Sequence, residues 1–150
     1  MNAHVYESTI TWSGSTSGGY ARYDRQHRVS AGQTSMPLSA DPAFHGDAAL
    51  PNPEQLLLAA ASSCQLLSFL AVAARAGVEV IDYHDEATAI MPLGVRPMRI
   101  TEIVLSPTVT VRLADPATVV RLMHEAHAGC FIAHSLTASL EMDITVEVAA

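Results

Sequence analysis

The segment from Gln55 to Ala74 constrains the fold most, because its twenty residues carry no formal charge. Asn52 in front of it is a good helix N-cap, and Pro53 suits the first helical position. Glu54 complements the positive end of the helix dipole, and Gly77 offers a C-terminal stop. The pattern predicts a helix of about 24 residues, roughly 36 Å long.

A helix that is apolar on every side has to be covered on every side. Its length is that of a membrane span, but serine and glutamine interrupt it and no basic anchors flank it, so we expect burial in protein and no membrane. A chain of 150 residues with much predicted strand cannot enclose this helix alone. We therefore expect a homodimer in which the helix is central, with Ala59, Ala60, Ala61 and Ala71 allowing close approach of a partner helix.

The rest of the chain predicts strands and one further helix within a single domain, 1–150. Residues 35–51, with three prolines, are expected to be irregular. Asp115 and Pro116 open the second helix, which ends near Gly129. Strict alternation over Ser135 to Val148 predicts a half-buried antiparallel strand. Five predicted strands have bounds, 4–12, 20–29, 78–91, 96–113 and 135–148. The order β-β-β-α-β-β-α-β, which includes a third strand without bounds before the first helix, defines an α+β fold.

Composition excludes several functions. With eight basic against fifteen acidic residues the net charge is −7, and no basic cluster is present to bind nucleic acid. All eight cations are arginine, which excludes Schiff-base chemistry on lysine. Residues 1–7 lack the basic and apolar regions of a signal peptide, so we expect a cytoplasmic protein. Two cysteines are too few for a disulfide scaffold.

The two cysteines are the candidate reactive residues. Cys64 lies in the first predicted helix and Cys130 just past the second, each near polar side chains that a packed core does not need: Gln65, His127 and His134. Neither thiol lies at a helix N-terminus, and the thiolate is the form that attacks. A reactive cysteine here is therefore expected to need a cation.

Arg25 is the best candidate for that cation. It shares one face of its predicted strand with Tyr23, His27 and Val29, and if this face is the inner one its guanidinium needs an anion; the alternative places it at the sheet edge in water. Glu54 is the natural carboxylate to orient it. Glu54 and Cys64 are about 15 Å apart along one helix, so either Arg25 bridges a long gap or Glu54 comes from the partner chain.

Several motifs together resemble the OsmC/Ohr family of hydroperoxide peroxidases, over nearly the whole chain. They are Asn52-Pro53-Glu54-Gln55-Leu56-Leu57, Ser63-Cys64, and Ala126-His127-Ala128-Gly129-Cys130. Three further segments resemble the OsmC-like branch more than Ohr proper: Tyr23-Asp24-Arg25-Gln26-His27, Phe44-His45-Gly46-Asp47 and Gly77-Val78-Glu79-Val80.

The resemblance implies an intertwined homodimer with long central helices packed on curved antiparallel sheets and two sites at the interface. It implies that Cys64 attacks the peroxide and that Cys130 resolves the sulfenic acid as a disulfide, which an external dithiol, in the Ohr branch a lipoylated protein, reduces. Glu54 matches the carboxylate that holds the family's arginine. No cofactor and no metal are implied. The first hairpin turn, 15–19, lacks the arginine that Ohr proteins carry there, so Arg25 has to substitute for it or the thiolate is less activated.

The residues leave two other readings open. Cys64, Cys130, His127 and His134 are suitable metal ligands, but their spacing matches no compact zinc pattern. The other reading is a ligand-binding or structural dimer whose cysteines are inert in the core. For the peroxidase, walls such as Leu57, Leu67 and Phe69 are expected to favour organic hydroperoxides over hydrogen peroxide.

Overall fold

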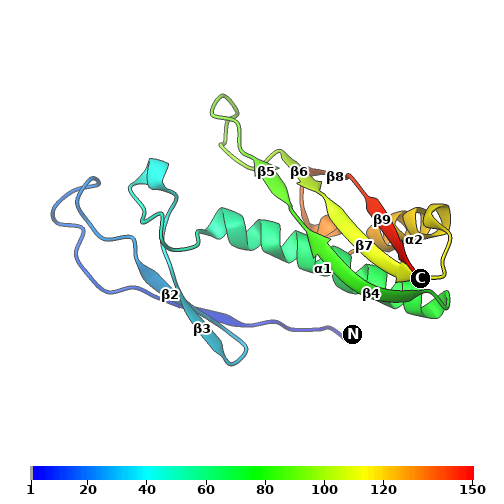
Figure 1. The fold of residues 1–150 in the computed structure, drawn as a ribbon. Coiled ribbons are helices and arrows are strands. Elements are labelled where there is room, and N and C mark those ends of the chain that lie inside the picture. Colours follow the sequence, from blue (N-terminus) through cyan, green and yellow to red (C-terminus); the bar gives the residue numbers. More distant parts are fainter. Residues whose placement is uncertain (1) are drawn as a thin grey trace. The chain divides into compact units, whose positions relative to one another are not determined.

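The computed structural model describes residues 2–150, so Met1 of the predicted domain lies outside the described residues. The chain divides into two units, Met1–Leu56 and Leu57–Ala150. Each is described by itself, and the single domain 1–150 stays a prediction. Helices and mixed sheets make this an α+β fold, as predicted. Figure 1 shows the elements along the chain.

The first unit holds a three-stranded antiparallel sheet in the order β1-β2-β3. Its strands are β1 (Ser8–Thr11), β2 (His27–Ala31) and β3 (Thr34–Leu38), followed by a short 3-10 helix, η1 (Pro42–Phe44). The predicted strand over 20–29 is wrong for residues 20–26, where Gly19, with φ of +84°, turns the chain and Asp24 Oδ1 accepts from Gln26 N. Within the segment predicted to be irregular, 35–51, residues 35–38 belong to strand β3.

Helix α1 (Pro53–Arg75) begins and ends close to the predicted positions. Asn52 Oδ1 accepts from Gln55 N, and Gln55 Oε1 accepts from Asn52 N, a reciprocal cap of the first turn. Gly77, with φ of +73°, reverses the chain after the last turn, where Val78 N donates to Ala73 O. The N-cap, proline and glycine thus fix this helix locally.

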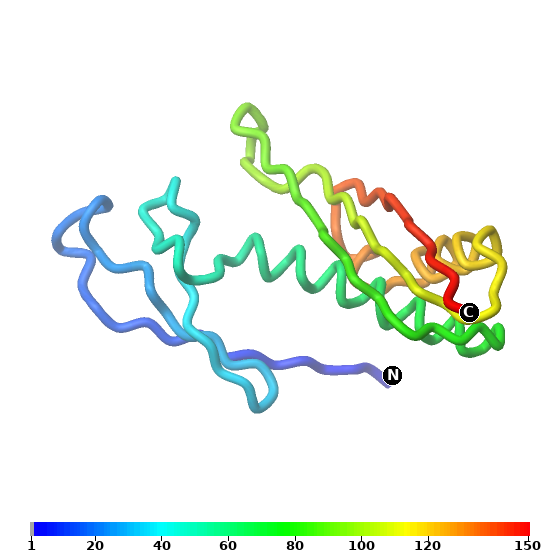
Figure 2. Tube along the Cα trace, viewed as in Figure 1, coloured from blue at the N-terminus to red at the C-terminus, as the bar shows by residue number. Residues whose placement is uncertain are grey.

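The second unit contains two three-stranded sheets, β4-β7-β9 and β5-β6-β8. Helix α2 (Pro116–Ala128) starts at the predicted cap, where Asp115 accepts from Thr118 N. Figure 2 shows the continuous path of the backbone through these elements. The strands are β4 (Glu79–Asp85), β5 (Thr88–Ile90), β6 (Glu102–Leu105), β7 (Pro107–Arg112), β8 (Ser139–Met142) and β9 (Thr145–Ala149), with a 3-10 helix η2 (Ala133–Ser135) before β8.

Strand pairing in this unit corrects two predictions. The segment 135–148 is not one antiparallel strand: β8 pairs with β6 and β9 with β7, both parallel. The reason is α2, since a helical crossover returns the chain in the same direction. The predicted strands 78–91 and 96–113 are each divided in two, so that each sheet mixes parallel and antiparallel pairs.

Both helices of the second unit pack on the sheet β4-β7-β9 (Figure 1). The main core lies between them and β7, and is built from Phe69, Ala73, Val109, Val111, Val119, Leu122, Met123 and Ala126. A second cluster joins Ala61 to Ile103 and Leu105. The inner side of α2 therefore consists of Val119, Leu122, Met123 and Ala126.

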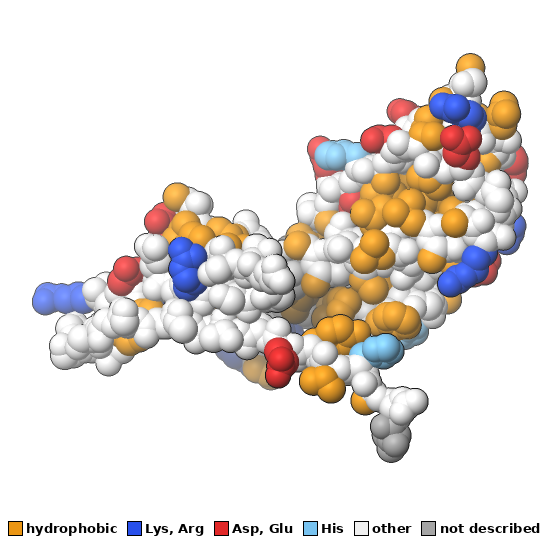
Figure 3. Space-filling view, turned by 90° about the horizontal axis from the view of Figure 1, so that it is seen from below, with side chains coloured by type: hydrophobic (Ala, Val, Ile, Leu, Met, Phe, Trp, Pro, Cys, Tyr) orange, Lys and Arg blue, Asp and Glu red, His pale blue; other side chains and the backbone are white. Residues whose placement is uncertain are grey.

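Much of α1 lies outside these cores. Among the described residues it is the one helix that is long and apolar enough to cross a membrane, with a mean hydropathy of 2.0 over 18 residues, of which 22% are buried. Leu67 is 64% exposed and Leu70 38%. Figure 3 shows hydrophobic side chains gathered on one face of the second unit. The single chain thus leaves apolar side chains of this helix exposed, and their covering by a second protein chain stays a prediction.

Candidate active site

The structure brings the two cysteines together. Cys64 lies in the middle of α1, and Cys130 follows Gly129, the C-cap of α2. Both thiols are free and are hydrogen-bond partners of each other. Cys130 is fully buried, whereas Cys64 is partly exposed. Two sulfur atoms 66 positions apart along the chain are thus neighbours within the unit 57–150.

The environment of Cys64 favours its thiolate. Burial acts to raise the pKa of Cys64, but hydrogen bonds outweigh it and leave the pKa below its usual value. The donors are the Cys130 thiol, the backbone N–H groups of Ile132 and Phe131, and the Ser68 hydroxyl. Neutral donors are thus the groups that lower the pKa of Cys64 within this unit, and the need for a cation such as Arg25 stays a prediction.

Cys130 has the opposite environment. Burial raises its pKa, and its hydrogen bond to Cys64 and the charge of that sulfur raise it further. Burial is the main cause of this raised pKa. At neutral pH Cys64 is therefore the better nucleophile and Cys130 the protonated donor beside it.

Cys64 opens into a cavity of about 400 Å³. Its lining is Cys64, Leu67, Ser68, Ala71, Val72, Arg75, Glu125, Ala126, Gly129 and Phe131. Of the predicted apolar walls only Leu67 lines it: Phe69 points into the core and Leu57 packs against the second cluster. The apolar side chains and the single accessible sulfur make this a site for a small, largely apolar reactant.

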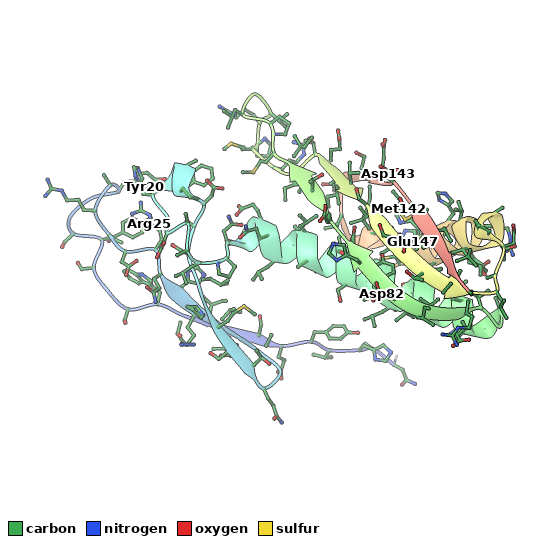
Figure 4. The ribbon with its side chains drawn as sticks, viewed as in Figure 1. Tyr20, Arg25, Asp82, Met142, Asp143 and Glu147 are labelled. Carbon is green, nitrogen blue, oxygen red and sulfur yellow. The ribbon has the colours of Figure 1, made fainter. Side chains whose placement is uncertain are left out.

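Arg25 and Glu54 line a cavity of about 470 Å³ within the first unit. The Arg25 guanidinium lies 3.7 Å from the centroid of the Tyr23 ring and 4.9 Å from that of Tyr20, and it donates to the carbonyl oxygens of both. Figure 4 shows Arg25 beside Tyr20. Arg25 is half-buried, between the inner position and the solvated sheet edge that the sequence left open, and carbonyl oxygens and rings, rather than a carboxylate, satisfy it. Among the described residues, no ion pair within 4.0 Å joins it to Glu54.

The four predicted site residues form two pairs, one in each unit of the chain. Cys64 and Cys130 meet in one unit, and Arg25 and Glu54 share a cavity of the other. The relation between these two pairs stays a prediction. Ser68 was missed, although its position one turn after Cys64 is a detectable signal. The amides of Phe131 and Ile132 were also missed, and no side-chain pattern reveals a backbone donor. Within residues 2–150, no group of three or more histidines, cysteines or carboxylates could hold a metal ion.

Comparison with known proteins places the chain in a family. Residues 45–145 match the family described as OsmC-like protein. The chain therefore belongs to the OsmC/Ohr family. It is 23% identical over 124 residues to the uncharacterized protein YmaD of Bacillus subtilis, covering 80% of this chain and 83% of that protein.

Solved structures share the fold. An OsmC-like protein of unknown function from Vibrio cholerae superposes with a TM-score of 0.85 at 27% identity, covering 95% of this chain and 99% of that one. An organic hydroperoxide resistance protein from Elizabethkingia anophelis, with thiocyanate bound, superposes with a TM-score of 0.72 at 17% identity over 99% of both chains.

Proposed function

We propose that this protein is a cysteine-based peroxidase that reduces organic hydroperoxides. The observation that carries the proposal is the pair of thiols, one of lowered and one of raised pKa, hydrogen-bonded to each other at an apolar cavity. Membership of the OsmC/Ohr family, in which similar structures are named organic hydroperoxide resistance proteins, supports a peroxide-related role.

The first step uses the Cys64 thiolate. It attacks one oxygen of the hydroperoxide, the O–O bond breaks, and the alkoxide takes up a proton to leave as an alcohol. Cys64 becomes a sulfenic acid. The N–H groups of Phe131 and Ile132, which hold the thiolate beforehand, fix its position for this attack. In this proposal Arg25, whose cavity Glu54 also lines, stabilises the negative charge that develops on the leaving oxygen.

The second step uses Cys130. Its sulfur attacks that of the Cys64 sulfenic acid, the S–O bond breaks, and hydroxide leaves with the Cys130 proton as water, so that a disulfide forms. An external dithiol then reduces the disulfide and is itself oxidised. Cys130 is fully buried, so the hydrogen bond between the thiols supplies the proximity that this step needs.

The dimer belongs to the same proposal. Leu67 and Leu70 leave an apolar face of α1 open in the single chain, and covering it with a second copy removes apolar area from water. In this dimer, the Arg25 of one chain would act on the reaction at Cys64 of its own chain or of the partner chain.

Mass spectrometry after one equivalent of cumene hydroperoxide tests the function. The reduced protein should lose two hydrogens and yield a peptide joining Cys64 to Cys130, while Cys130→Ser should stop at a trappable sulfenic acid on Cys64. Arg25→Gln should slow peroxide consumption about tenfold or more. Thiols that stay unmodified would instead favour a structural or ligand-binding dimer, and faster oxidation by hydrogen peroxide would refute the preference for organic substrates.

A further inference from the structure

One polar side chain lies in the contact between α1 and α2. The helix α1 buries one residue per turn along a single stripe, Ala61, Gln65, Phe69 and Ala73. Gln65 is fully buried and directly follows Cys64. Its Nε2 donates to Met123 O at 3.1 Å and to Met123 Sδ at 3.2 Å. Among the side-chain hydrogen bonds of residues 2–150, these alone join the two helices.

Stability does not explain this amide. Gln65 Oε1 is buried and has no hydrogen-bond partner, which carries a desolvation penalty. An apolar side chain of the same shape would fill the space without that penalty, and every other member of the stripe is apolar. What the glutamine provides is therefore a fixed position of one helix on the other. A hydrogen bond weakens when its donor and acceptor shift slightly, whereas apolar side chains can slide past each other with little loss.

The hydrogen bond of Gln65 fixes the position of α2 along α1, and this position also determines how close Cys130 lies to Cys64. Met123 lies seven residues before Cys130, and the backbone between them stays hydrogen-bonded: Gly129 N donates to Ala126 O and Cys130 N to His127 O. A shift of α2 along α1 would thus carry Cys130 with it. On α1, Gln65 is adjacent to Cys64, so the Gln65–Met123 bond joins the two helices next to the first cysteine.

We propose that Gln65 is a positioning residue that holds α2 in register on α1 and so keeps Cys130 within bonding distance of Cys64. The inference rests on the proposed function in one respect, that Cys64 and Cys130 form the disulfide. It predicts that removing the amide lowers the effective concentration of one thiol at the other, and that it weakens the hydrogen bonds that Cys130, Phe131 and Ile132 give to Cys64.

Equilibration with glutathione measures this effective concentration directly. Oxidised glutathione converts the Cys64–Cys130 dithiol to the disulfide and yields two reduced glutathione molecules, and the equilibrium constant reports how well the sulfur atoms are placed. For Gln65→Met, which keeps the volume and removes the amide, we expect this constant to fall about tenfold. Alkylation of Cys64 by iodoacetamide at pH 7 should slow as well, because its donors on Cys130, Phe131 and Ile132 shift with α2.

Phe69→Leu is the matched control. Phe69 belongs to the same buried stripe, one turn further on, but makes no hydrogen bond to α2, so its loss weakens packing without removing the directional contact. We expect its constant to stay within about twofold of wild type even where its thermal stability falls as much as that of Gln65→Met. Should Gln65→Met not fold, Gln65→Glu replaces it: its constant relative to wild type should recover at acidic pH, where the carboxylic acid again donates to Met123 O.

The outcomes separate the two proposals. The positioning role is overturned if Gln65→Met and wild type have equal equilibrium constants with glutathione, or if the constant of Phe69→Leu falls as much as that of Gln65→Met. Neither result contradicts the proposed peroxidase activity. A wild-type pair that equilibrates with glutathione but does not react with hydroperoxide removes the peroxidase and leaves the positioning role standing. A wild-type pair that forms no disulfide with glutathione overturns the positioning role.

Discussion

Cys64 owes its acidity to hydrogen-bond donors rather than to a formal charge. Backbone N–H groups, a hydroxyl and a second thiol all point to its sulfur, and together they outweigh the burial that would raise its pKa. Donors of this kind remain in place when the thiolate becomes a sulfenic acid. They therefore stabilise the nucleophile and hold its oxidised form for attack by Cys130.

Ser68 provides the test at the level of one residue. Ser68→Ala removes a hydroxyl donor and should raise the pKa of Cys64, so that less thiolate is present at neutral pH. We expect alkylation of Cys64 by iodoacetamide at pH 7 to slow about two- to fivefold, with the pH profile shifted to higher pH. Ser63→Ala, at an exposed position beside Cys64, should leave the profile unchanged. Identical profiles for Ser68→Ala and wild type would contradict the role of the hydroxyl.

The sequence located the cysteines but not what activates them. A serine one helical turn after Cys64 is visible in the sequence, because residues four apart share a face. The backbone donors of Phe131 and Ile132 are not, because they depend on how the turn after α2 folds back onto α1. For Arg25 the alternation of its neighbours left an inner position and the sheet edge open. The structure places it half-buried before β2, where its partners are carbonyl oxygens, which composition cannot reveal.

The C-terminal end of α2 adds a pH-dependent element. His127 Nδ1 is buried without a partner, and its pKa is lowered by burial first and then by the charges of His134 and His124. The folded state therefore binds a proton less readily than the unfolded chain. Stability is complete above the ordinary histidine pKa of about 6.5 and is lost as the pH falls from there through the lower folded pKa.

His127→Gln should remove this dependence. The variant's melting temperature should fall by about 2 °C less than that of wild type between pH 7 and pH 5, because no buried imidazole then has to be protonated. Differential scanning calorimetry at the two pH values measures the difference. His4→Gln, at an exposed position in the first unit, should melt with the wild-type pH dependence. If the melting temperatures of His127→Gln and wild type fall equally between pH 7 and pH 5, the pH dependence does not come from His127.

At the level of secondary-structure elements, the two helices were predictable from the sequence, whereas the bounds and pairing of the strands were not. Both helices start at an Asn or Asp cap followed by proline, signals that lie within a few residues of the sequence. Strand direction and division depend on distant partners. The predicted alternation holds in β8 and at the start of β9 and ends at Val148, which is 50% exposed, and both strands pair parallel because α2 precedes them. Alternation indicates which face is wet and says nothing of the neighbouring strand.

At the level of the whole molecule, the open face of α1 was also predictable, because a helix without a charged side has to be covered. What covers it depends on a second molecule, which a single sequence does not specify. Leu70 is suited to testing the proposed dimer: it is exposed on α1 and does not line the cavity of Cys64.

Leu70→Glu should dissociate the dimer. In a single chain the glutamate would be solvated and nearly neutral in effect, but at a subunit interface it buries an unpaired charge, which costs several kcal/mol. Sedimentation equilibrium should give wild type twice the mass of one chain and should give Leu70→Glu a dissociation constant at least about a hundredfold higher. Leu93→Glu is the control, since Leu93 is 76% exposed in the segment between β5 and β6, and it should remain dimeric. A wild-type protein that sediments as a single chain would remove the dimer from the proposal, and an unchanged dissociation constant in Leu70→Glu would place the interface away from this face of α1.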